Sequence, residues 1–215
     1  MPLTLHLAGA GKTKLVSKVV DSINEALEQR PNDEAFAYFY CDRNQDNRRD
    51  PELILSSLVR QLSIVQDEHS LQRLVCQLFQ KERRNGFASG KLDFEQSQTL
   101  LAQLMGIYPQ VTLVVDALDE CDVHTRFKLI GALDALVKES PSLLKVFISS
   151  RPDRDIKHRF ESGPNKEIRA TDNRDDIAKY VEDKLATSPG YWQQQLSPVL
   201  RTEICEVLVV KSEGM

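Results

Sequence analysis

The stretch VTLVVDALDEC, residues 111–121, indicates the fold of this chain. Its first half is an apolar run rich in β-branched residues, and its second half is acidic. A strand that is apolar throughout is typical of a parallel sheet whose two faces are both covered by helices. We therefore expect an α/β protein, with the acidic residues at the carboxyl end of a central strand, where ligands bind in such sheets.

Strand patterns alternate with helix patterns on both sides of this stretch. Further strands are predicted at residues 3–7, 35–40 and 143–153, with a short one near 166–169. Helices are predicted at residues 12–29, 51–64, 71–79, 94–107, 127–136, 174–186 and 198–211. This order predicts a three-layer sandwich: a mainly parallel five-stranded sheet with helices on both faces, followed by C-terminal helices.

Composition excludes several classes of protein. The 215 residues include 28 Lys and Arg against 32 Asp and Glu, a net charge of −4, so no basic footprint for nucleic acid is present. No apolar run approaches the roughly 18 residues of a membrane span, and the N-terminus does not read as a signal peptide. The four cysteines lack metal-ligand spacing, which favours reduced thiols in a cytoplasmic protein.

A second motif, HLAGAGKT, occupies residues 6–13, between the first strand and the first helix. It ends as the phosphate-binding pattern G-x-x-x-x-G-K-[ST] does, but histidine stands at position 6, where that pattern has glycine. Glycines let backbone N–H groups approach phosphate oxygens, and the helix that follows points its positive end at the same place. We expect His6 to strain or reshape the loop and to weaken binding roughly 10- to 100-fold without abolishing it.

Residues 9–14 form the predicted nucleotide-binding segment, which consists of Gly9, Ala10, Gly11, Lys12, Thr13 and Lys14. Lys12 is expected to reach the β- and γ-phosphates, and the hydroxyl of Thr13 to ligate Mg²⁺. The alternative is a glycine-rich turn that binds nothing.

The acidic motif DALDE, residues 116–120, supplies the complementary groups. Asp116 at the strand end is placed to hold Mg²⁺ opposite Thr13, and Glu120 is placed to orient or deprotonate an attacking water. Asp119 adds negative charge, which a cation or a solvent-exposed rim would tolerate. The alternative is an acidic turn without chemistry.

A third polar segment, SSRPD, residues 149–153, forms the polar end of the strand predicted at 143–153. Ser149, Ser150 and Arg151 should lie near the γ-phosphate end of a bound nucleotide, where Arg151 would sense that phosphate or stabilise the charge being transferred. The candidate catalytic residues are therefore Glu120, Asp119 and Arg151. The alternative for Arg151 is a surface salt bridge to a neighbouring aspartate, Asp153 or Asp155.

With these motifs placed, the chain resembles the NACHT nucleoside-triphosphatase domain in its nephrocystin 3-like N-terminal version, which is found in many fungal multidomain proteins. The resemblance rests on AGAGKTKLVSKVVD, FAYFYCD, DPELILSSLVRQL, LVVDALDEC and KVFISSRPDRDI, at residues 8–21, 36–42, 50–62, 113–121 and 145–156. It implies a signal-transducing switch of the STAND type that binds and slowly hydrolyses ATP or GTP with Mg²⁺.

The resemblance also implies an NTPase core at residues 1–170 and a C-terminal helical segment at residues 171–215. Family members commonly continue into a winged-helix region and carry effector and repeat regions. These regions are the expected partners, together with self-association and the nucleotide. We interpret the chain as a fragment, either an isolated core or a truncated gene model.

The sequence is also compatible with two other functions. The first is a non-catalytic interaction module whose phosphate loop is impaired at His6. The second is a small P-loop kinase, which is disfavoured because the chain has no arginine-rich lid and because the acids after the central strand favour water as the acceptor.

Overall fold

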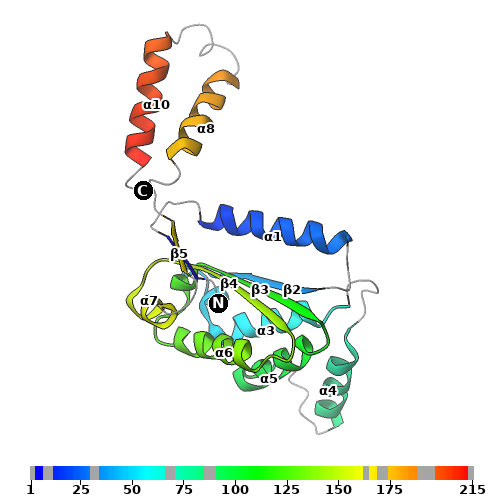
Figure 1. Cartoon of the computed structure of the whole chain (residues 1–215). Helices are drawn as coiled ribbons and strands as arrows, with labels where there is room; N and C mark the ends of the chain where they lie inside the picture. Colours follow the sequence, from blue (N-terminus) through cyan, green and yellow to red (C-terminus); the bar gives the residue numbers. More distant parts are fainter. Residues whose placement is uncertain are drawn as a thin grey trace.

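The computed structural model describes residues 3–6, 12–29, 34–65, 71–84, 91–161, 165–168, 174–187 and 197–212. Its sheet is built from strands whose pairings are all parallel, in the order β2-β3-β4-β1-β5. The strands are β1 (Leu3–His6), β2 (Ala35–Tyr40), β3 (Gln110–Asp116), β4 (Leu143–Ser150) and β5 (Asn165–Ile168). The α/β class is confirmed, as is a parallel sheet with helices on both sides (Figure 1).

The helices fill the connections between these strands and continue beyond β5. They are α1 (Lys12–Gln29), α2 (Asp46–Arg49), α3 (Pro51–Leu62), α4 (Arg73–Arg84), α5 (Phe94–Met105), the short 3₁₀ helix η1 (Leu118–Glu120), α6 (Arg126–Glu139), α7 (Arg154–Phe160), α8 (Arg174–Thr187) and α10 (Pro198–Ser212). Figure 1 shows α1 on one face of the sheet and α3, α5 and α6 on the other.

The direction of each connection explains which face its helix covers. The step from β1 to β2 runs toward one edge of the sheet, and the later steps from β2 to β3, β3 to β4 and β4 to β5 run toward the other edge. Because such crossovers are right-handed, opposite directions place the connecting helices on opposite faces. The direction reverses between β1 and β4, which are neighbours. In open α/β sheets, ligands bind at the carboxyl ends of the strands where such a reversal occurs.

The side chains of β3 pack against both layers of helices. Val114 belongs to the apolar cluster formed with Val16 and Val20 of α1. Its neighbours Leu113 and Val115 belong to the larger cluster on the other face. Successive side chains of a strand point to opposite faces, so burial of both faces requires an apolar residue at every position. This is the reason for the continuous apolar run in the sequence.

Capping residues set the first turns of α3 and α5, two helices that pack in the larger apolar cluster. The Asp50 side chain accepts a hydrogen bond from the Glu52 backbone N–H, and Pro51 stands at the first helical position of α3. Asp93 and Gln96 form a reciprocal capping box at the start of α5. Each cap satisfies backbone donors that the first turn of a helix leaves unpaired.

Several details of the sequence prediction are wrong. The helix predicted to 64 ends at Leu62, because the chain turns back there and Ile64 forms an isolated bridge with Leu71. The short helices α2 and α7 were not predicted, because neither is long enough to show a helical period.

The C-terminal helices α8 and α10 pack against each other and project from the sheet (Figure 1). No helix in the part of the chain that the structure describes combines the length and the apolar character of a membrane span.

Candidate functional site

Three segments meet near the carboxyl ends of β1 and β4. They are the first turn of α1, the turn that follows β3, and the segment that follows β4. Residues 7–11 lie outside the described residues. They include Gly9, Ala10 and Gly11, which are predicted to contact the phosphates. Lys14 is exposed on the first turn of α1.

His6 is the last residue of β1 and is paired with Ile168 of β5. Among the described residues, the only non-glycine residue with a positive φ is Ala117. The backbone of His6 is therefore extended, which any residue adopts without strain. The strain expected at this position is not found in the His6 backbone itself.

Asp116 is joined to both neighbouring segments by hydroxyl groups. Thr13 Oγ1 at the start of α1 donates to Asp116 Oδ2 at 2.9 Å. Ser149 Oγ at the end of β4 donates to the other oxygen, Oδ1, and itself accepts from the Ala117 backbone N–H at 3.0 Å. Since β4 lies between β1 and β3, Ser149 is placed to support Asp116 from the strand between them. The carboxylate is buried and oriented from two sides.

The pair Thr13 and Asp116 fits a Mg²⁺ ion. Mg²⁺ prefers oxygen ligands at 2.0–2.1 Å in octahedral geometry, so adjacent ligands lie about 2.9 Å apart. The Thr13 and Asp116 oxygens have this separation. Mg²⁺ in nucleotide sites commonly takes one or two protein ligands and completes its shell with phosphate and water. Among the described residues, no group of three or more His, Cys, Asp or Glu side chains could hold a metal ion.

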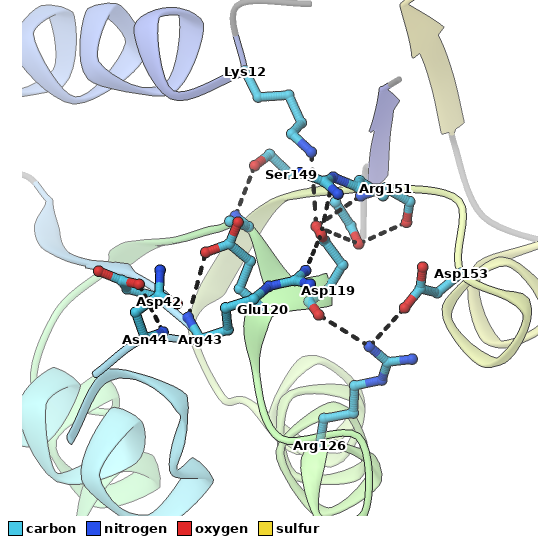
Figure 2. A network of polar contacts seen from close by, with 12 residues as sticks. Lys12, Asp42, Arg43, Asn44, Asp119, Glu120, Arg126, Ser149, Arg151 and Asp153 are labelled. Carbon is cyan, nitrogen blue, oxygen red and sulfur yellow. Dashed lines mark hydrogen bonds and ion pairs between the residues drawn. The ribbon is translucent and has the colours of Figure 1, made fainter. Parts of the chain in front are cut away.

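Asp119 is a buried carboxylate surrounded by cations (Figure 2). Its side chain is 1% exposed and lies 3.8 Å from Lys12 Nζ, 3.6 Å from Arg43 Nη2 and 3.4 Å from Arg151 Nε. The Arg151 backbone N–H also donates to Asp119 Oδ1 at 2.8 Å. Burial lowers the pKa of the Lys12 ammonium, and the Asp119 carboxylate partly offsets that effect. Cations, and not a solvent-exposed rim, therefore stabilise the charge of Asp119.

Glu120 lies at the end of η1 and is only partly buried. Its Oε2 accepts a long hydrogen bond, 3.4 Å, from the Arg43 backbone N–H. A contact of this length is weak, so the carboxylate keeps the capacity to accept a hydrogen bond from water.

Arg126 connects the acidic turn to the segment after β4. Its side chain, 3% exposed, makes an ion pair with Asp153 at 2.9 Å and a bidentate one with Asp155. Its Nη1 also lies 3.4 Å from the Asp119 backbone oxygen. Burial by itself lowers the pKa of Arg126, but the hydrogen bonds to Asp155 and Asp153 raise it above its ordinary value. The ion pair of Arg151 is with Asp119, and not with Asp153 or Asp155 as the alternative has it.

Two site residues were missed in the sequence, although signals for both are present. Arg126 precedes Leu129 by three residues and Ile130 by four, so the three side chains lie on the same face of α6. A charged residue on that apolar face is the signal. Arg43 follows β2, and the carboxyl ends of parallel strands meet at one edge of the sheet.

Two of the four free cysteines flank this site. Cys41 follows β2 and Cys121 follows η1, and both are buried. Burial raises the pKa of Cys121 to about 12 and that of Cys41 well above its ordinary value. Both therefore remain protonated thiols at neutral pH.

Ala117 stores backbone strain in this turn. It adopts φ 54° and ψ 51°, the left-handed conformation, directly after Asp116. An L-residue pays roughly 1–2 kcal/mol in this conformation, a cost that glycine avoids. Ala117→Gly is expected to raise the free energy of unfolding by about 1 kcal/mol, measured by urea denaturation. Ala135→Gly in the interior of α6 is the matched control and should lower the free energy of unfolding by about 1 kcal/mol. An equal decrease in the free energy of unfolding in both variants would contradict strain at Ala117.

Fold and site together define an α/β protein whose parallel sheet and loop arrangement are compatible with a P-loop fold. The family model described as Nephrocystin 3, N-terminal matches residues 4–151. The chain belongs to this family, which confirms the resemblance drawn from the motifs. No curated protein matches the chain.

Proposed function

We propose that this chain is a nucleoside-triphosphate-binding switch module with slow hydrolysis of ATP or GTP. Its core would be a five-stranded P-loop NTPase sandwich at residues 1–170, and residues 171–215 would be the helical start of a further region. Within a longer cytoplasmic signalling protein of the NACHT type, nucleotide exchange would change the contacts of the module with neighbouring domains or with other copies.

The hydrogen bond between Thr13 and Asp116 carries this proposal. It joins the first turn of α1 to the end of β3 at the 2.9 Å separation of adjacent Mg²⁺ ligands. Lys12, the residue before Thr13, lies 3.8 Å from Asp119 in the same acidic turn, which supports a phosphate site next to this pair.

Each residue has a defined part in the proposed site. Lys12 would hold the β- and γ-phosphates, and Thr13 and Asp116 would hold Mg²⁺, which neutralises phosphate charge when bound. Glu120 would accept a hydrogen bond from the attacking water and orient it. Arg151 would donate to the terminal phosphate, whose developing charge a guanidinium stabilises.

Titration of the protein with a fluorescent ATP analogue and Mg²⁺ tests this function. Lys12→Ala is expected to weaken binding by about 10- to 100-fold, because a charge-assisted hydrogen bond to phosphate contributes roughly 1.5–3 kcal/mol. Lys18→Ala is the matched control, since Lys18 is exposed on the same helix. If the folded wild-type protein does not bind the analogue, the switch function is excluded and the interaction module is the remaining reading.

A further inference from the structure

Asp119 brings together cations from three separate segments. Lys12 begins α1, Arg43 follows β2 and Arg151 follows β4. Each has a side-chain nitrogen within 3.8 Å of the Asp119 carboxylate, and in Figure 2 their side chains converge on it. We call Lys12, Arg43 and Arg151 the cation cluster. Three positive charges therefore surround Asp119, and the carboxylates of Asp116 and Glu120 also act on Lys12.

The hydrogen bonding within this cluster is incomplete. Asp119 Oδ2 lies 3.6 Å from Arg43 and 3.4 Å from Arg151. Neither Asp119 Oδ2 nor Arg151 Nε has a hydrogen-bond partner in the described part of the chain, and both atoms are buried. An unpaired buried donor is costly, so Arg151 Nε would gain from an additional anion whose oxygens accept hydrogen bonds.

Arg43 is the member of the cluster that is best able to reach such an anion. Its side chain is 53% exposed, so it can change rotamer without leaving a packed position. Arg43 and Lys12, the residue proposed to hold the phosphates, both lie beside the Asp119 carboxylate, so their charged ends are close together. A phosphate held by Lys12 would therefore be within reach of Arg43. A guanidinium matches phosphate oxygens in a bidentate geometry.

We propose that Arg43 binds the terminal phosphate of a nucleoside triphosphate and so distinguishes it from the diphosphate, while Asp119 holds the guanidinium in place when that phosphate is absent. This inference rests on the proposed function. The backbone N–H of Arg43 donates to Glu120 Oε2.

Isothermal titration of the whole chain with Mg²⁺ and either ADP or a non-hydrolysable β,γ-imido ATP analogue tests the inference. Arg43→Ala is expected to raise the dissociation constant of the triphosphate analogue about tenfold and to leave that of ADP within twofold. Arg43→Lys should recover part of the loss, because it keeps the charge but not the bidentate fork. Arg48→Ala, at an exposed arginine of α2, is the matched control and should bind both nucleotides as the wild type does.

The outcomes separate this inference from the proposed function. If Arg43→Ala weakens the binding of both nucleotides equally, or of neither, the role of Arg43 is overturned. The switch function then stands, because the wild type still binds nucleotide. A folded wild type that binds neither nucleotide removes the proposed function and the role of Arg43 with it.

Discussion

Glu120→Gln is expected to lower nucleoside-triphosphate hydrolysis by about 100- to 1,000-fold, within the range that a positioned general base contributes. The substitution preserves the size of the side chain and keeps an oxygen that can accept from the Arg43 backbone N–H, as Glu120 Oε2 does at 3.4 Å. It removes the negative charge that would accept a proton from water. The Thr13–Asp116 pair is untouched, so the dissociation constant for the triphosphate should stay within about threefold.

Phosphate release under saturating ATP or GTP with Mg²⁺ measures this effect, and a fluorescent analogue measures binding in the same preparation. Glu139→Gln at the end of α6 is the matched control, because Glu139 is exposed and lies outside the site. Unchanged turnover in Glu120→Gln would remove Glu120 from its proposed role. Loss of binding together with turnover would instead mean that the carboxylate holds the nucleotide-binding geometry.

Leu101→Ala is expected to lower the free energy of unfolding by about 3 kcal/mol, with a range of roughly 2–5 kcal/mol for a fully buried leucine. Leu101 lies in α5, is 0% exposed and belongs to the larger apolar cluster, together with Leu58 of α3 and Leu113 of β3. Truncation removes apolar contacts and leaves a cavity, because the surrounding helices and sheet relax only in part.

Urea denaturation with a comparison of m-values measures this loss. Leu143→Ala is the matched control, since Leu143 is 59% exposed at the start of β4 and should change stability by less than about 1 kcal/mol. A loss below 1 kcal/mol in Leu101→Ala would show that the layer between α5 and the sheet closes around the missing side chain. An altered m-value would instead indicate a change in the unfolded or native state.

Regular elements could be predicted from the sequence wherever their spacing is long and consistent. The prediction for residues 12–29 matches α1, and the prediction for 35–40 matches β2, because an 18-residue helical period and an apolar six-residue run leave little ambiguity. The ends of α3 and α5 were less accurate, since tertiary contacts decide whether Ile64 and Ile107 continue a helix or turn away from it.

The candidate site could be predicted in its residue types but not in its pairings. Lys12, Thr13 and Asp116 were singled out because a loop motif and an acidic strand end carry local signals. The contact of Arg151 with Asp119 was not predicted, because the sequence suggested a terminal phosphate as its partner and, as the alternative, the nearby Asp153 or Asp155. Local spacing does not reveal which of several carboxylates lies nearest across the edge of a sheet.

The sequence by itself determined the alternation of strands and helices, the burial of β3 on both faces, and the polar residues at the strand ends, since each depends on spacing along the chain. Only the tertiary structure decided that β4 separates β1 from β3, and so places Ser149 against Asp116. It also decided that Asp119 is buried among cations from three segments. These contacts depend on strand order and on which helix covers which face, because distances between segments far apart in the chain are fixed only when the sheet is assembled.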